Sequence, residues 1–209
     1  PFPSNWRNRP LQFNVPFSVI IFSEFFIERY TKFIKNGGII DETHLKPFVM
    51  EFVVSWMKER GGGHYKFINE IMFMLFSNSM KDVSARDMPN VIETHITMPY
   101  IVDYIVDVLV HFTEFRENGT LNLRGYLDNV YIKIVDLYGF INIYYPVLEI
   151  FYKNYSSLGA AELDIFNQLK FIFVEYLYKP RHKEISMHEL VSDLNLLGDL
   201  ITFSLTGTK

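Results

Sequence analysis

The sequence predicts an all-α fold, because apolar residues recur at helical spacing, glycine runs separate the periodic segments, and clear β alternation is absent. Residues 17–35 show the pattern well, since their apolar residues follow the i, i+3, i+4, i+7 spacing of one helix face. The segment ends at Asn36-Gly37-Gly38, a typical C-terminal stop signal. We therefore expect helix-loop-helix units, with strands limited to two-residue bridges between loops.

The same periodicity predicts the later helices in order. The second helix starts near Asp41 and ends before Gly61-Gly62-Gly63. Further helices are expected at residues 64–76, 97–116, 122–135, 142–156, 160–178 and 186–204. Prolines punctuate residues 1–16, which predicts an extended arm. We divide the rest into two helical lobes, residues 17–95 and 96–209.

Several predicted helices are preceded by one apolar residue and one good N-cap, whose side chain accepts a hydrogen bond from the first turn. The pairs are Ile40-Asp41, Val83-Ser84, Ile96-Thr97, Leu121-Asn122, Ile141-Asn142 and Ile185-Ser186. Ile40 and Val83 are 43 residues apart, Val83 and Leu121 are 38 apart, and Ile141 and Ile185 are 44 apart. A repeat of about 40 residues is typical of EF-hands, in which the apolar residue of one loop pairs with that of a partner loop. This spacing predicts that Ile141 pairs with Ile185, and Ile40 (or Ile39) with Val83.

The loops lack the oxygen ligands that calcium needs at positions 1, 3, 5 and 12 of an EF-hand loop. The last loop, residues 178–189, offers Tyr178, Pro180 and His182 at the first three of these positions. The loops at residues 76–87 and 114–125 each keep a few ligand-type residues but interrupt the set. The sequence therefore predicts paired helix-loop-helix units of a degenerate, calcium-independent EF-hand type.

The chain also resembles a known family, the B-double-prime class of protein phosphatase type 2A regulatory subunits. The matching residues of its C-terminal EF-hand lobe are Asp136-Leu137, Gly139, Leu148-Glu149, Phe151-Tyr152, Lys179-Pro180-Arg181 and the run from Ile185 to Leu190. Residues 66–68, Val83 and Met88 resemble its first lobe. The resemblance implies a regulatory subunit that binds a phosphatase core. The chain departs from the family in lacking acidic calcium loops and much of the segment between the lobes.

Composition and motifs argue against several other functions. The net charge of −4, with both signs mixed along the chain, does not suit a nucleic-acid-binding surface. There are no cysteines, no HExxH, no GxSxG and no phosphate-binding loop. The six histidines are expected at the surface or at helix ends: His44, His64, His95, His111, His182 and His188. We therefore expect no catalytic residues, no metal ligands, no cofactor and no membrane span.

The remaining signal is aromatic, with 20 Phe and 13 Tyr, because protein interfaces favour such side chains. The expected partner-binding residues lie in the arm and around the helix at 142–156: Phe2, Trp6, Phe13, Tyr144, Tyr145, Tyr152 and Tyr155. The sequence thus predicts a non-catalytic protein-binding subunit, regulatory or scaffolding. The alternative is a structural subunit of a large assembly, such as an organellar complex or a virus particle. With no signal peptide and no cysteine, an intracellular location is favoured.

Overall fold

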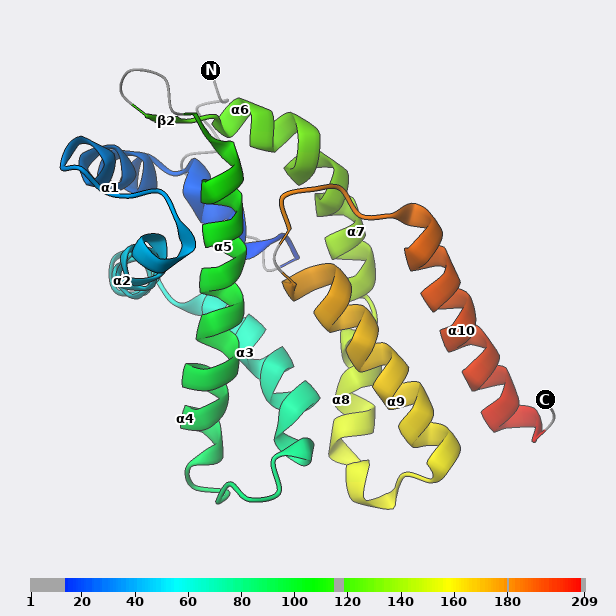
Figure 1. Cartoon of the computed structure of the whole chain (residues 1–209). Helices are drawn as coiled ribbons and strands as arrows, with labels where there is room; N and C mark the ends of the chain where they lie inside the picture. Colours follow the sequence, from blue (N-terminus) through cyan, green and yellow to red (C-terminus); the bar gives the residue numbers. More distant parts are fainter. Residues whose placement is uncertain (1–13, 115–118, 180, 208–209) are drawn as a thin grey trace.

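A computed structural model describes residues 14–114, 119–179 and 181–207, and these residues are helical nearly throughout (Figure 1). The all-α prediction is confirmed. In the described part, the paired strands are β1 (Thr113–Glu114) and β2 (Thr120–Leu121), which form an antiparallel hairpin with Thr113 opposite Leu121. The hairpin joins two helices that are consecutive in the chain, so it is not a bridge between distant loops.

Most helices overlap the segments that the apolar periodicity predicts, but residues 88–96 are helical without having been predicted so, the helix predicted at 97–116 ends at Phe112, and the one predicted at 122–135 continues to Asn142. In chain order they are η2 (Phe17–Phe22), α1 (Glu24–Lys35), α2 (Glu42–Arg60), α3 (Gly63–Phe76), η3 (Ser77–Ser79), α4 (Met88–Ile92), η4 (Glu93–Thr97), α5 (Met98–Phe112), α6 (Leu123–Tyr126), η5 (Leu127–Tyr131), α7 (Ile132–Asn142), α8 (Tyr145–Lys153), η6 (Tyr155–Ser157), α9 (Ala160–Phe173), η7 (Val174–Tyr178) and α10 (Met187–Thr206). The elements η4, η5 and η7 are single π-helical turns that extend or join α-helical segments.

Three of the predicted N-caps are confirmed by hydrogen bonds to the first turn. The Asp41 carboxylate accepts a hydrogen bond from the His44 backbone N–H at 2.8 Å. The side-chain oxygen Oδ1 of Asn122 accepts one from the Gly125 backbone N–H at 2.7 Å. Ser186 accepts from the Glu189 N–H and starts α10. These polar side chains satisfy backbone donors that have no partner within the helix, which fixes where each helix begins.

Two other predicted helix starts are wrong, because the chain remains helical through them. Thr97 lies in the π-helical turn between α4 and α5, and its hydroxyl donates to the Asn69 side chain at 2.5 Å. Asn142 is the last residue of α7, and its side-chain amide donates back to the Tyr138 carbonyl. Each polar side chain finds a partner without acting as a cap, so its presence did not mark a start.

The predicted pairing of loop residues is also wrong. Ile141 lies within α7 and is fully buried, so it is not part of a strand. Ile40, Val83 and Ile185 are likewise outside the strand pair that the structure describes. The residues that the spacing placed in paired loops are instead apolar side chains that pack onto the core. The EF-hand arrangement therefore loses the backbone pairing that would have defined it.

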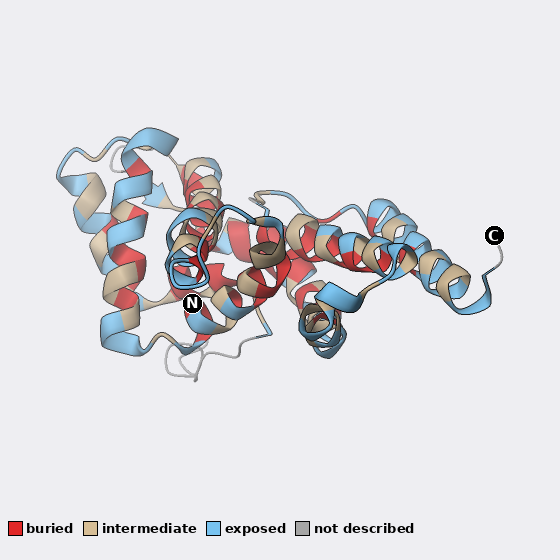
Figure 2. Ribbon diagram, turned by 90° about the horizontal axis from the view of Figure 1, so that it is seen from below, coloured by how far each residue is buried: buried red, intermediate tan, exposed pale blue. Residues whose placement is uncertain are grey.

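The core is built around α5, which α2 and η2 contact, together with the η7 turn (Figure 1). Ile105, Val108 and Leu109 of α5 are completely buried. Figure 2 shows burial concentrated in the middle of the molecule and thinning toward the C-terminal helices. The predicted boundary between the lobes, at residues 95 and 96, falls inside the helical run from α4 to α5. The division of the chain into lobes stays a prediction.

Candidate functional site

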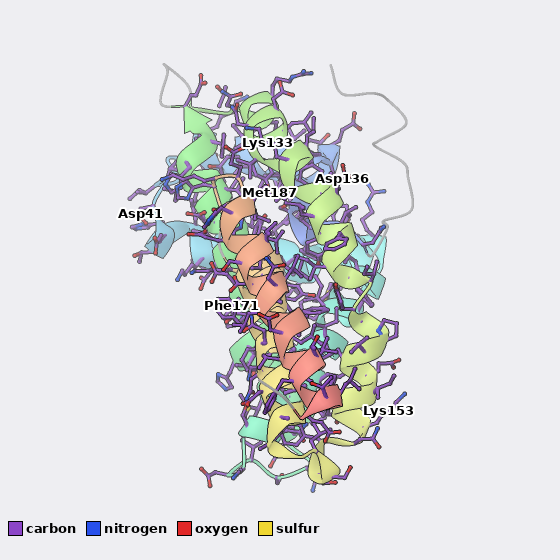
Figure 3. All side chains as sticks on the ribbon, turned by 90° about the vertical axis from the view of Figure 1, so that its right-hand side faces the viewer. Asp41, Lys133, Asp136, Lys153, Phe171 and Met187 are labelled. Atoms are coloured by element: carbon purple, nitrogen blue, oxygen red, sulfur yellow. The ribbon has the colours of Figure 1, made fainter. Side chains whose placement is uncertain are left out.

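The last three α-helices enclose an apolar groove. Its floor is α9, with Ile165 and Leu169, and its walls are α8 and α10. The groove has a volume of about 560 Å³. Its apolar lining is Tyr144, Val147, Ile150, Phe151, Leu158, Ile165, Leu169, Leu197, Ile201 and Leu205. Figure 3 shows α10 running down the molecule from Met187 toward the level of Lys153, at the end of α8.

The groove exists because α10 is attached to the rest of the molecule mainly through α9. Of its 20 residues, Leu190 and Leu197 are the buried ones. Asp193 holds the two helices together, since its carbonyl accepts from Gln168 and its carboxylate accepts from the Tyr176 hydroxyl. Leu194, Leu200 and Phe203 are half-buried, and the other apolar residues of the helix stay exposed, among them Leu205 at 82%. An amphipathic helix of this length normally buries a wider apolar stripe.

Charge around the groove is predominantly acidic. The helices α8, α9 and α10 carry six Asp or Glu residues and two lysines, and α10 has no Lys or Arg. Lys153 pairs with Glu149 on its own helix at 3.7 Å. Lys170 lies over the Phe76 ring, 4.1 Å from its centre. Each of the two lysines already has a contact within the molecule, so an excess of acidic residues remains near the groove.

The predicted partner-binding tyrosines lie around α8 and are half-buried. Tyr144 lines the groove. Tyr145 and Tyr152 turn toward α3, where they contact the rings of Phe67 and Phe73, and Tyr155 contacts Phe166 of α9. Their role in partner binding stays a prediction. Phe2, Trp6 and Phe13 lie outside the described residues.

Sequence reasoning missed the aliphatic residues that alternate with these tyrosines. Ile143 and Ile150 are each 62% exposed. Val147 lies between them in the sequence and is also exposed. Their 3–4 residue spacing forms a second apolar stripe beside the buried one that contains Leu148. A helix with two apolar stripes must bury one against a neighbour and leaves the other available. These two apolar stripes are the feature of the sequence from which the exposed aliphatic residues could have been predicted.

A second feature is a polar cluster at the end of α5. Asp107 and His111 occupy neighbouring turns of this helix, and His182 reaches them from the segment before α10. The Asp107 carboxylate oxygens lie 2.9 and 3.0 Å from Nδ1 of His182, and one of them lies 3.3 Å from Nδ1 of His111. Nδ1 of His111 is also 2.8 Å from the Asp107 backbone carbonyl oxygen. One carboxylate therefore holds two imidazoles.

The two imidazole rings are stacked in parallel, with their centres 3.5 Å apart and their planes inclined by 4°. All three side chains are partly exposed to solvent. No sequence pattern linked them, because Asp107 and His182 are 75 residues apart in the chain. Only the D-x-x-x-H spacing on one helix face was visible beforehand, and it is common in helices.

Burial also shifts the pKa values of three groups in the core, Tyr30, Tyr104 and His64. It raises the pKa of Tyr30 and of Tyr104 to about 12, and it lowers the pKa of His64 to about 4. These three groups are uncharged at neutral pH, which suits side chains that serve packing. None of them lines the groove between α8 and α10.

Comparisons of the chain with protein-family models, curated proteins and solved structures find no match. Within the described residues, no single helix has both the length and the apolar character needed to cross a membrane. The bent pair formed by residues 123–142 and 145–153 meets that criterion only when its two helices are taken together.

Proposed function

We propose that the chain is a non-catalytic, protein-binding subunit whose groove between α8, α9 and α10 receives an amphipathic, basic helix of a partner protein. The observation that carries the proposal is the set of aliphatic side chains that three helices direct into one hollow. Ile150, Ile201 and Leu205 are 62%, 40% and 82% exposed there. Single exposed apolar residues are ordinary, whereas several that converge on one groove mark an interaction site.

A helix is the occupant that fits the groove best. Two roughly side-by-side helices over a third form a channel that a fourth helix completes, as in other helix-in-groove complexes. Burying an aliphatic side chain fully is worth about 1.5–3 kcal/mol, so a few anchors at positions such as Ile150 and Leu205 supply the main attraction. The acidic excess on α8–α10 favours a partner with Lys or Arg flanking its apolar face, and it accelerates the encounter.

The resemblance to phosphatase type 2A regulatory subunits makes a phosphatase core one candidate partner. In the alternative, a structural subunit of a large assembly, a neighbouring subunit would fill the groove. The mass of the isolated protein in solution separates these versions. A regulatory or scaffolding subunit is expected to remain a monomer at micromolar concentration, whereas an assembly subunit is expected to aggregate when it is alone.

The binding test uses synthetic peptides of known chemistry. A fluorescent 18-residue amphipathic helix with leucine on one face and lysine on the other is compared with a Leu/Glu helix and a scrambled Leu/Lys sequence. Fluorescence anisotropy measures binding as a function of salt. We expect binding of the basic helix alone, weakened by Ile150→Asp and by Leu205→Asp, and weakened further as salt screens the acidic helices.

The matched control is Ile39→Asp, since Ile39 is also an exposed aliphatic residue, at 53%, but lies outside the groove lining. It should leave binding unchanged. The proposal is wrong if Ile39→Asp reduces binding as much as Ile150→Asp does, or if all three peptides bind equally. If the chain self-associates and Leu205→Asp abolishes this self-association, the occupant of the groove is a second copy of the chain and not a helix of another protein.

A further inference from the structure

We propose that Asp107, His111 and His182 form a binding site for a divalent transition-metal ion of the zinc class. The proposal is independent of the groove and runs against the sequence-based prediction that no histidine is a metal ligand. It rests on three ligand-type side chains from two separate segments whose ligand atoms all lie within 4.8 Å of one another.

The distances in the cluster are close to those of a metal site. Two ligands bound to zinc at about 2.0–2.1 Å and at the tetrahedral angle lie roughly 3.3 Å apart. The Asp107 carboxylate is 2.9 Å from Nδ1 of His182 and 3.3 Å from Nδ1 of His111. A metal ion can therefore replace the hydrogen between the Asp107 carboxylate and His182 with changes of a few tenths of an ångström along these two edges, while Nδ1 of His111 exchanges its 2.8 Å contact with the Asp107 backbone carbonyl for the ion. The parallel rings need only tilt toward a common point.

The donor set selects the class of ion. Two imidazoles and one carboxylate suit zinc and its first-row neighbours, whereas calcium and magnesium prefer six or more oxygen ligands. A tetrahedral ion would have one further position, and the His111 side chain is 42% exposed, so that water reaches it. Neighbouring charge does not oppose the ion strongly, because the Arg181 guanidinium is held by the carbonyl and the carboxylate of Glu175.

Binding would have a structural consequence. His182 belongs to the segment that leads from η7 to α10, whereas Asp107 and His111 are fixed on α5. An ion shared by all three would attach that segment to the central helix of the core. It would stabilise the folded chain, because the two segments meet only in the folded state.

The test uses the full chain without an affinity tag, stripped with a chelator and titrated with ZnCl₂ in a calorimeter. We expect one ion per chain with a dissociation constant of about 1 µM or lower. Cobalt should give the visible absorption of a tetrahedral site. Zinc at about 100 times its dissociation constant should raise Tm by about 5–10 °C, whereas calcium at the same excess should not.

The variants His111→Ala and His182→Ala should each weaken zinc binding by more than about 100-fold, since even groups that only orient ligands contribute roughly 10- to 100-fold. The matched control is His44→Ala, which removes a His44–Asp41 pair whose 2.8 Å contact is close to the 2.9 Å between His182 and Asp107, but which has no third ligand among the described residues. The thermal unfolding of each variant is measured without metal to confirm that it folds. If His182→Ala does not fold, His182→Gln is used in its place. The proposal is overturned by failure to bind zinc, by unchanged binding in both histidine variants, or by loss of binding in His44→Ala.

Discussion

The hydroxyl groups of Ser18 and Tyr126 lie 2.8 Å apart in a hydrogen bond, although 108 residues separate them in the chain. Ser18 is 1% exposed and Tyr126 is completely buried. The bond connects η2 with the helix that follows the β hairpin. Burial raises the pKa of Tyr126 well above its usual value, so its proton is retained for the bond. The N-terminal part of the described chain is thereby fixed to its middle.

Removing either hydroxyl should destabilise the fold, because the other then loses a buried hydrogen bond and keeps only its contact with the Tyr104 hydroxyl. We expect Tyr126→Phe and Ser18→Ala each to reduce the free energy of unfolding by about 1–3 kcal/mol. The double variant should lose less than the sum of the two, since the hydrogen bond between these two hydroxyl groups can be lost only once. Urea denaturation of the four proteins measures this. Strictly additive losses would show that the two hydroxyl groups do not interact.

The helices could be predicted from the sequence because their apolar spacing reports burial directly, and η2, α1, α2, α3 and α9 follow it. The junctions could not. Thr97 and Asn142 have the side chains of N-caps, but each donates a hydrogen bond to a residue on a neighbouring turn or helix instead. The same side chain is compatible with both roles, and tertiary contacts decide between them. The EF-hand pairing failed for this reason.

The candidate sites were predictable to different extents. The groove depends on the double apolar stripe of α8, which the sequence shows, and on the splayed position of α10, which it does not. The Asp107–His111–His182 cluster depends on a contact across 75 residues, and no spacing rule reaches that far. Aromatic content pointed to the region of α8, but the tyrosines there mostly face α3 and α9.

Stability should fall on acidification because of His64. Burial lowers its pKa in the folded chain to about 4, although a hydrogen bond with the Val15 backbone opposes the shift in part. An unfolded histidine has a pKa of about 6.5. Between these values the unfolded state binds more protons, so this contribution is complete above pH 6.5 and is lost progressively toward pH 4. The loss amounts to about 3 kcal/mol.

The measurement is the free energy of unfolding at several pH values for the natural chain and for His64→Gln. Because the substitution also changes the absolute stability at neutral pH, the slope between pH 6.5 and 4.5 is the quantity compared. We expect a shallower slope in His64→Gln. Equal slopes would mean that His64 takes up its proton without unfolding. His95→Gln is the control, since His95 is exposed.

Calcium should not stabilise the chain. In the loop at residues 178–189, Tyr178 stands where the first oxygen ligand is required, and its side chain is buried. His182 in the same loop faces Asp107 on α5. We expect Tm to change by no more than about 1 °C between excess chelator and millimolar calcium, whereas a filled site would add about 2–3 kcal/mol. An increase of several degrees that magnesium does not reproduce would contradict this prediction.

Substitution of two nearby residues of α8 should affect stability to very different extents, because the helix buries one apolar stripe and exposes the other. Leu148 is completely buried, whereas Ile150 is 62% exposed in the groove wall. Leu148→Ala should cost about 2–5 kcal/mol of stability through lost burial and the cavity that remains. Ile150→Asp should change stability by no more than about 0.5 kcal/mol, as substitutions at exposed sites usually do.

The comparison tests whether the groove is open in solution, which peptide binding alone does not establish. If α10 closed over α8, Ile150 would be covered, and a carboxylate placed there would be buried at a high cost in free energy. Urea denaturation of the two variants, with Ile39→Asp as the exposed control, gives the answer. A loss of 2 kcal/mol or more in Ile150→Asp, beyond that of Ile39→Asp, would show that α10 already fills the position that we assign to a partner helix.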